Sequence, residues 1–345
     1  MSDATNTRGR SSYEGFRGTI KTIGTGPRGS RALSFEEARE AMGALLAGEV
    51  TDAQAGAFLV AMRTKGEEPE ELAGLAQALR DAALSRDAVR PGLVACAGSY
   101  DGVAESPQLS LAAAVVAAAA GASCVVHCGA RLGPKYGTSP ADVLAALGGP
   151  ARPDLDTSRR MLEASGVAVV HCGEAIPGWD RLARIRDEVG LRGPVHSAEK
   201  LVDHLGAERF VVGYTHQPYG PRIIGALHRL GAESSLAVRG IEGSDVPRPA
   251  RPQASGLDGL EMPQRLDLRL PPGGADPSES ADISRAVLQR EEDGAIGTAV
   301  VLGAMLRLRV AGVCDTATSG VEAARGAIRS GAAAATLDRL LEATA

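Results

Sequence analysis

The sequence predicts an α/β protein: a small all-α N-terminal domain, then a mostly parallel central sheet flanked by helices. Three observations lead to this expectation. Strand-like and helix-like segments alternate over residues 92–240, which is typical of parallel sheets with helical crossovers. Residues 34–88 show only helical patterns. The 345-residue chain is 44% hydrophobic but only 3% aromatic, so Ala, Val and Leu must build its core.

The N-terminal domain is expected over residues 34–90, after a tail and basic arm at 1–33. Its three helices are expected at 34–49, 51–66 and 68–85. The first begins at Ser34, and Glu37 three residues later completes a capping box. Thr51 caps the second helix, and the third has apolar residues at helical spacing. Helices from about 180–205 are expected to pack on this domain.

The α/β domain is expected over residues 91–345. Strands are expected at 92–98, 122–129, 167–173, 209–216 and 234–240. Helices are expected at 110–121, 139–149, 156–166, 197–206 and 221–231, and in the tail at 280–291, 295–310 and 319–343. Ligands of such sheets bind beyond the carboxyl ends of the strands, so the chemistry is expected there.

Composition narrows the class of protein and its compartment. The net charge of -5 and the pI of about 5.8 argue against a large basic surface for nucleic acid. Five cysteines without a signal-peptide pattern indicate a reduced, cytoplasmic compartment. The longest apolar run, residues 111–126, is shorter than a spanning helix, so no membrane segment is expected.

The first strand end, residues 95–102, is a candidate phosphate loop. Strand-to-helix turns cradle phosphates because backbone N–H groups and the helix N-terminus face the anion. Gly98 and Gly102 fit such a turn, and Ser110 lies near the start of the next helix. Tyr100 is bulky, and we expect it to occupy room that a glycine would leave for diphosphate. An anion is therefore expected to bind weakly near Gly102 and Ser110.

Cations follow two other strands. Arg131 and Lys135 follow the second strand, and Arg239 ends the last one. The planar fork of an arginine donates two parallel hydrogen bonds to a phosphate. The alternative is that these are solvated loop charges, and Lys135 with Tyr136 is also compatible with contacts to a nucleic-acid backbone or base.

Two sets of residues suggest a metal site. Glu242 and Asp245 are hard oxygen ligands that suit Mg²⁺, although they would also balance nearby arginines in a surface loop. The pentapeptide VVHCG occurs at 125–129 and 169–173, which suggests zinc by residue type. Adjacent residues of a strand point to opposite faces, however, and a buried cysteine usually behaves as a small hydrophobe. We therefore do not predict zinc from His127, Cys128, His171 and Cys172.

Several stretches resemble the family of anthranilate phosphoribosyltransferase and the pyrimidine-nucleoside phosphorylases, and the resemblance covers residues 19–343. The closest match to the helical domain of that family is LLAGEVTDAQAGAFLVAMRTKGEEPEELAGLAQALRDAA. The stretch RIRDEVGLRG resembles the family pattern V-R-x-E-L-G-x-R-T. The fold of this family is a helical domain beside an α/β domain, as predicted above.

The loops depart from the family pattern. The family's G-T-G-G-D-G corresponds to Ala97 through Gly102, and its K-H-G-N-R keeps only His127 and, after one insertion, Arg131. The metal motif H-G-x-D-G-L-D-E becomes RGIEGSDV, in which Val246 replaces the last acid. These departures are similar to a divergent anthranilate phosphoribosyltransferase-like branch, some of whose members resemble nucleic-acid-binding proteins.

The resemblance implies transfer of a phosphoribosyl group from PRPP to an aromatic amine acid, as in tryptophan biosynthesis. The residues that it assigns to PRPP or phosphate are Gly98, Asp101, Gly102, Ser110, His127, Arg131, Lys135 and Arg239. All of them except Asp101 are expected to converge on one cleft between the domains. Arg186 would receive the acceptor's carboxylate, and Glu242 with Asp245 would bind Mg²⁺. The resemblance also implies a homodimer through the helical domain. No catalytic residue is assigned, because this chemistry needs positioning and electrostatics rather than a nucleophile.

An alternative from another class remains open. The chain would then be a non-catalytic or respecialised paralogue that binds nucleic acid or another polyanion in a basic groove. The acidic pI argues against it. A basic N-terminal run argues for it: Arg8, Arg10, Arg17, Lys21, Arg28 and Arg31.

Overall fold

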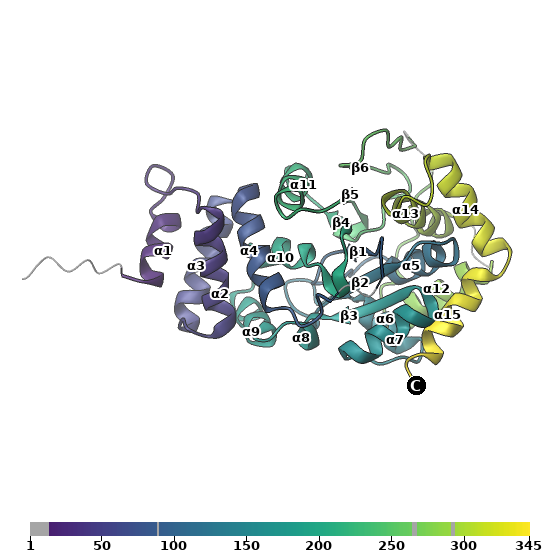
Figure 1. Ribbon diagram of the computed structural model, residues 1–345, viewed down its shortest axis with the longest axis horizontal. Helices are drawn as coiled ribbons and strands as arrows, with labels where there is room; N and C mark the ends of the chain where they lie inside the picture. Colours follow the sequence, from purple (N-terminus) through teal and green to yellow (C-terminus); the bar gives the residue numbers. More distant parts are fainter. Residues whose placement is uncertain (1–13, 88–89, 264–267, 291–293) are drawn as a thin grey trace, which may run out of the picture.

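The computed structural model describes residues 14–87, 90–263, 268–290 and 294–345. A helical domain lies at one end of the molecule, a sheet in the middle and the last four helices at the other end (Figure 1). The two-part architecture predicted from the sequence is confirmed. Arg8 and Arg10 of the basic run lie outside the described residues.

The described residues form one six-stranded sheet, in the order β3-β2-β1-β4-β5-β6. Its strands are β1 Val94–Ala97, β2 Cys124–Cys128, β3 Val167–His171, β4 Arg209–Tyr214, β5 Ser234–Arg239 and β6 Ala254–Ser255. The first five strands are parallel, and β6 pairs antiparallel with β5 at the edge. The chain runs outward from β1 to β3, then crosses to β4 on the other side of β1. The carboxyl ends of β1 and β4 therefore form a topological switch point, where α/β proteins bind ligands.

The helical domain contains α1 Phe16–Gly24, α2 Phe35–Ala47, α3 Asp52–Lys65 and α4 Pro69–Ala82. The capping box of Ser34 and Glu37 is present, and Thr51 caps α3 with Gln54. Helix α1 was not expected, because this stretch reads as a basic arm. Its Phe16 ring lies 5.5 Å from that of Phe58 in α3, so the arm begins as a packed helix.

The segment after β3 joins the two domains. Helices α8 Cys172–Ala175, α9 Trp179–Val189 and α10 Val195–Ala198 follow β3, and α9 and α10 contact α2, α3 and α4. The helix expected over 197–206 is broken into α10 and two 3-10 turns, η1 Glu199–Leu201 and η2 His204–Gly206. Leu205 has a φ of 57°, and this left-handed residue turns the chain toward β4.

The remaining helices cover the sheet. They are α5 Ser110–Ala119, α6 Pro140–Ala146, α7 Leu155–Ser165, α11 Tyr219–Arg229, α12 Pro277–Leu288, α13 Ala295–Ala311, α14 Ala317–Arg329 and α15 Ala332–Glu342. The tail helix expected at 319–343 is thus two helices, separated at Gly331, whose φ of 81° ends the helical path.

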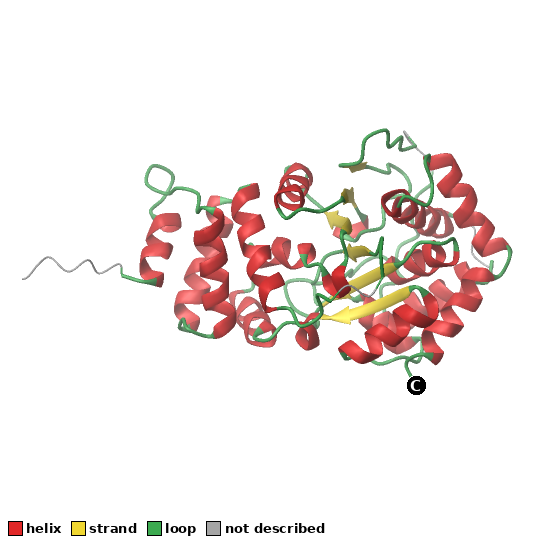
Figure 2. Cartoon of the chain, viewed as in Figure 1, coloured by secondary structure: helices red, strands yellow, loops and turns green. Residues whose placement is uncertain are grey.

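Each face of the sheet has its own core because side chains alternate along a strand. Ala95 and Phe210 face the core shared with the helical domain, whereas Val94 and Val211 face the core under α5 and α13. In Figure 2 the arrows of the parallel strands point toward the helical domain. The loops after the strands therefore lie between the sheet and that domain. Among the described residues, no helix is long and apolar enough to cross a membrane.

Candidate functional site

A cavity of about 410 Å³ lies at the carboxyl end of β4, next to the helical domain. Its apolar wall includes the rings of Tyr214 and Tyr219 and the side chain of Ile223. Three cations also line it, namely Arg63 from α3, Arg192 after α9 and Lys200 from η1. A concave site with aromatic walls and a few charged groups is suited to a small planar anion.

The three cations are held in place by the chain around them. Arg192 forms an ion pair of 2.6 Å with Asp101, whose carboxylate is buried. Lys200 is 4% exposed, and its Nζ donates to the carbonyl of Gly213 at 3.0 Å. Burial lowers the pKa of Lys200 to about 8, although the carboxylates of Glu199 and Asp101 oppose this shift. Arg63 donates to the carbonyl of Arg192.

The two glycines of the first loop are required by close backbone packing. A Cβ at Gly98 would lie 2.8 Å from the Cα of Ser244, and a Cβ at Gly102 would lie 2.4 Å from the carbonyl carbon of Gly137. Gly102 also has a φ of 74°, which other residues adopt only with strain. These glycines therefore bring three loops together, and backbone atoms fill the space that a side chain would need at each of them.

The Glu242 carboxylate, which comes from the turn after β5, lies against the backbone that follows the first loop. It accepts hydrogen bonds of 3.0 Å from the backbone N–H groups of both Ala104 and Glu105. Lys135 lies 3.3 Å from it and also donates to the carbonyl of Gly102 at 3.1 Å. Although burial opposes it, these donors lower the pKa of Glu242. Two N–H groups that directly follow the expected phosphate loop are thus already satisfied by a carboxylate of the chain.

Asp245 is part of a buried ion pair. Its side chain is fully buried, one carboxylate oxygen accepts from the hydroxyl of Ser110, and the other is paired with Arg307 of α13. Mg²⁺ prefers ligands that let it keep several waters. A buried carboxylate neutralised by arginine and a Glu242 held by three donors do not fit such a site. The expectation of a metal pair is therefore not met in this arrangement.

Arg307 is the partner that the sequence reasoning missed. It lies in the apolar stretch of α13 and is itself fully buried. An arginine inside a long apolar helix was the available signal, because a buried charge requires a partner. The pairing accounts for Ser110 and Asp245 structurally and leaves neither side chain open to a ligand.

Tyr100 and His127 are also buried rather than exposed to an anion. Tyr100 is 1% exposed, and its hydroxyl lies 2.5 Å from His127 Nδ1 and 3.0 Å from Cys172 Sγ. The expectation that Tyr100 blocks the diphosphate position is wrong, because its ring packs into the core and its hydroxyl finds partners there. Burial raises the pKa of Tyr100 and lowers that of His127.

Arg186 already has a carboxylate partner within the chain. It is 4% exposed, and its two terminal nitrogens lie 2.5 and 3.3 Å from the oxygens of Glu199. The guanidinium also lies over the ring of Trp179, 5.6 Å from its centroid. Burial raises the pKa of Glu199 to about 7, against the effect of Arg186. Arg186 is thus not open to an acceptor in this conformation.

The remaining cations lie apart from the cavity. Arg131 is half exposed and donates to the carbonyl of Gly137 at 3.3 Å. Arg239 donates to Gln253 at 3.1 Å. The seven residues expected to converge on one cleft do not line this cavity, and their convergence stays a prediction. The structure groups Gly102, Lys135 and Glu242 in the loop cluster, and Asp101 reaches the cavity only through Arg192.

Comparison with known proteins identifies the class. Residues 18–83 match the helical bundle domain of the Glycosyl transferase family, and residues 101–253 match its a/b domain. These two matches together span more than half of the chain. The chain therefore has both domains of this glycosyl transferase family.

Relatives narrow this class further. The anthranilate phosphoribosyltransferase of Haloferax volcanii is 32% identical and covers 91% of this chain and 97% of its own length. That of Methylobacterium nodulans is 33% identical over 95% of this chain and 98% of its own. The chain therefore belongs to the anthranilate phosphoribosyltransferase family of glycosyl transferases, as its sequence motifs indicated.

Solved structures agree with this assignment. The crystal structure of anthranilate phosphoribosyltransferase from Thermus thermophilus has a TM-score of 0.79 and 30% identity, and covers 91% of this chain and 96% of its own. The Saccharomyces cerevisiae enzyme in complex with PRPP and Mg has a TM-score of 0.76 at 18% identity, with coverage of 95% and 97%. This second likeness supports the fold alone.

Proposed function

We propose that this protein transfers the phosphoribosyl group of PRPP to the amino group of an aromatic acid of the anthranilate type. The observation that carries the proposal is the cavity at the switch point, where three cations meet two tyrosine rings. Cations suit the diphosphate of one substrate and the carboxylate of the other. Aromatic walls suit a planar ring.

The reaction requires that the protein supply charged groups and hold the two substrates in the right position. The acceptor nitrogen forms a bond to the anomeric carbon while the carbon–oxygen bond to diphosphate breaks, and the nitrogen then loses a proton to solvent. Arg192 and Lys200 stabilise the negative charge that leaves with diphosphate. Tyr214 and Tyr219 orient the acceptor ring.

The acceptor's carboxylate has a different receiver from the one that the sequence suggested. Because Glu199 pairs with Arg186, we assign the carboxylate to Arg63, the third cation that lines the cavity. Arg186 serves the acceptor only in a conformation where Glu199 has moved away. The loop cluster of Gly102, Lys135 and Glu242 binds phosphate only if the Glu242 carboxylate moves away from the two N–H groups that donate to it.

Three further expectations belong to this proposal. The family includes a structure with PRPP and Mg, but Glu242 and Asp245 do not fit a magnesium site here, so we assign no protein ligand to the ion.

We propose a homodimer through the helical domain, which sedimentation showing only monomer at micromolar concentration would contradict. We also propose a cytoplasmic location, in keeping with five cysteines, all described, that are free.

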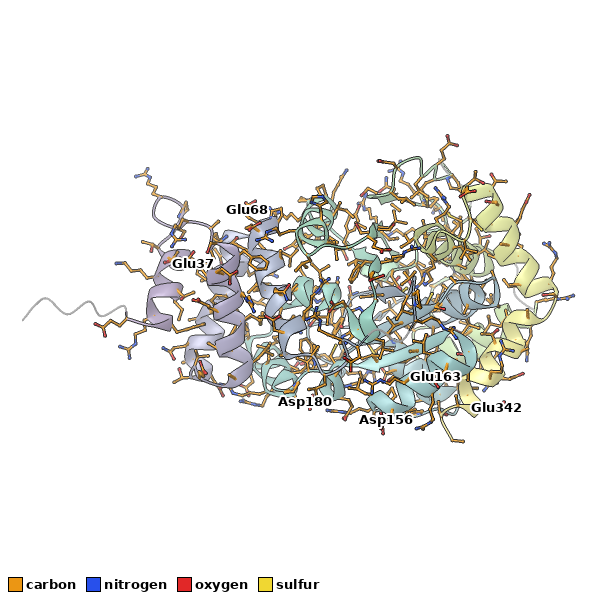
Figure 3. The ribbon with its side chains drawn as sticks, in the orientation of Figure 1. Glu37, Glu68, Asp156, Glu163, Asp180 and Glu342 are labelled. Carbon is orange, nitrogen blue, oxygen red and sulfur yellow. The ribbon has the colours of Figure 1, made fainter. Side chains whose placement is uncertain are left out.

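The comparisons do not favour the nucleic-acid alternative, because the relatives are transferases. The surface also carries carboxylates that would repel a polyanion. Those labelled Asp156, Glu163, Asp180 and Glu342 lie along one edge of the molecule, on α7, α9 and α15 (Figure 3).

Calorimetric titration with PRPP and Mg²⁺, followed by anthranilate turnover, tests the proposal. Arg192→Met and Lys200→Met should each weaken PRPP binding by about tenfold to a hundredfold, since each removes a charged hydrogen-bond donor. Arg184→Met is the matched control, because Arg184 is half exposed on α9 and does not line the cavity.

Two results would overturn the proposal. One is the absence of PRPP binding and turnover by the unmodified protein. The other is tight binding of single-stranded DNA that weakens steeply between two salt concentrations and depends on the same cations, which would favour the alternative.

A further inference from the structure

A second cluster of reactive side chains lies in the core shared by the sheet and the helical domain. It contains His127 from β2, Cys172 at the start of α8 and His204 in η2. One ring nitrogen of each histidine and the Cys172 sulfur all lie within 4.8 Å of one another. All three side chains are buried, and His127 is the most exposed at 1%. Neither the proposed transfer nor its cavity uses this cluster.

Strand register explains why these particular residues meet. In the parallel pairing of β2 with β3, Cys128 is opposite His171 and His127 is opposite Val170. Because side chains alternate, His127 and Cys172 point to one face and Cys128 to the other. Cys128 accordingly lies in the core under α5 and α13. Each of the two His–Cys dipeptides thus contributes one residue to the cluster, and His204 reaches it from the turn before β4.

The hydrogen bonds around the two histidines leave one nitrogen of each ring for a further ligand. His204 Nδ1 lies 2.5 Å from the Ser85 hydroxyl, while its Nε2 lies 3.6 Å from Cys172 Sγ. His127 Nδ1 lies 2.5 Å from the Tyr100 hydroxyl. Among the described residues, the buried Nε2 of His127 has no hydrogen-bond partner. One nitrogen fixed by a hydrogen bond and the other facing a ligand is the usual arrangement of metal-bound histidine.

A network of hydrogen bonds alone does not account for these groups. Whichever His127 nitrogen carries the proton, Nε2 remains a buried donor or acceptor without a partner in the described part of the chain, which is unfavourable. A cation bonded to Nε2 would satisfy it. Two ring nitrogens and a sulfur also exclude Mg²⁺ and Ca²⁺, because these cations take oxygen ligands.

We propose that His127, Cys172 and His204 bind a zinc ion. Zinc prefers nitrogen and sulfur ligands, and bonds of about 2.0 Å to nitrogen and about 2.3 Å to sulfur put these atoms about 3.5 Å apart in a tetrahedron. The separation of 3.6 Å between Cys172 Sγ and His204 Nε2 matches this edge, and the other two pairs, which lie within 4.8 Å, close toward it when the ion binds. On binding, the Cys172 thiol loses its proton to solvent and a zinc–sulfur bond forms, with no change of oxidation state.

Ser85 and Tyr100 act as positioning residues, because each hydroxyl holds one ring in the orientation that presents its other nitrogen. The ion ties the end of β2 and the start of α8 to the turn before β4. That turn follows η1, which carries Glu199 and Lys200. The inference does not depend on the proposed transfer, since it concerns the folded chain and not the reaction.

Metal analysis of the tag-free, full-length protein tests the site. Zinc-loaded protein, dialysed against metal-free buffer, should retain one zinc per chain, and cobalt should give a sulfur-to-cobalt charge-transfer band. Cys172→Ser should abolish that band, and His204→Asn should lose the stoichiometric metal. Tyr100→Phe should weaken binding by about tenfold to a hundredfold. Cys128→Ser is the matched control: it is an equally buried cysteine next to His127 on the opposite face, and it should keep both metal and band.

Thermal unfolding of the unmodified protein gives an answer even if a variant fails to fold. A chelator should lower Tm, and added zinc should restore it, because the ion binds only the folded state. The proposal is overturned if the unmodified protein takes up no zinc or cobalt and its Tm ignores the chelator. It is equally overturned if Cys128→Ser loses the cobalt band while Cys172→Ser keeps it.

Discussion

Breaking the Asp245–Arg307 ion pair should destabilise the protein strongly without involving any metal. Both side chains are fully buried, and Ser110 is the other donor to Asp245. Asp245→Asn leaves the Arg307 charge buried without its counter-ion, and Arg307→Met does the same to Asp245. Removing one partner of a buried pair costs about 3–5 kcal/mol, because the remaining charge has lost its water and its partner. Each single variant should therefore lose about that much free energy of unfolding.

The double variant, Asp245→Asn with Arg307→Met, should recover most of the loss. The asparagine oxygen still accepts from Ser110, and no uncompensated charge remains. Replacing a whole buried pair is often close to neutral, so the coupling free energy of the cycle should be about 3 kcal/mol or more. Glu233→Gln is the control, since its ion pair with Arg209 is half exposed and should contribute only about 0–1 kcal/mol.

Urea unfolding, followed by circular dichroism and by the fluorescence of Trp179, the single tryptophan, measures these free energies. The reasoning is refuted if either single variant costs less than about 1 kcal/mol, or if the double variant loses the sum of the two. Stabilisation of the unmodified protein by Mg²⁺ that disappears in Asp245→Asn would instead show that this carboxylate binds the ion.

Three further predictions test the loops and the buried acids. Because the pKa of Glu199 is raised from 4.5 to about 7, the folded state keeps a proton that the unfolded chain has released, so stability falls as pH rises through that window. The free energy of unfolding in urea, compared with that of Glu199→Gln, should therefore be lower at about pH 8 than at about pH 5. The same difference between the two proteins at both pH values would contradict this. Glu242→Ala frees the N–H groups of Ala104 and Glu105, so titrated diphosphate should bind about tenfold more tightly, and unaltered affinity would show that these groups do not meet the anion. Tyr100→Gly should cost about 3–5 kcal/mol of stability and leave PRPP affinity no better, whereas tighter PRPP binding would restore the view that the ring blocks the site.

Local patterns in the sequence were enough to predict the fold. The apolar runs of the strands, the Ser34 and Thr51 caps and the helical spacing of apolar residues depend on neighbours a few positions apart. The structure retains each of them. Helix α1 was missed because its basic residues suggest an arm, although Phe16, Ile20 and Ile23 repeat at helical spacing and pack on α3 and the core around it.

The sequence also predicted that the loops after the strands lie at one edge of the sheet, because the carboxyl ends of parallel strands must share that edge. Which side chains remain open there was a matter of tertiary structure. Arg63 and Arg192 lie 129 residues apart and meet only where the helical domain closes on β4. No spacing along the chain predicts that meeting.

The partners of the buried polar groups were decided by tertiary structure alone. A side chain such as Asp245 or Arg186 suits a ligand or an internal partner equally well when judged by residue type. Removal from water leaves a charge only the partners that folding brings within reach, and these come from distant segments: Asp245 meets Arg307, 62 residues away. For the same reason Tyr100, which the sequence places in a phosphate loop, lies instead against His127 in the core, where its hydroxyl is satisfied without water.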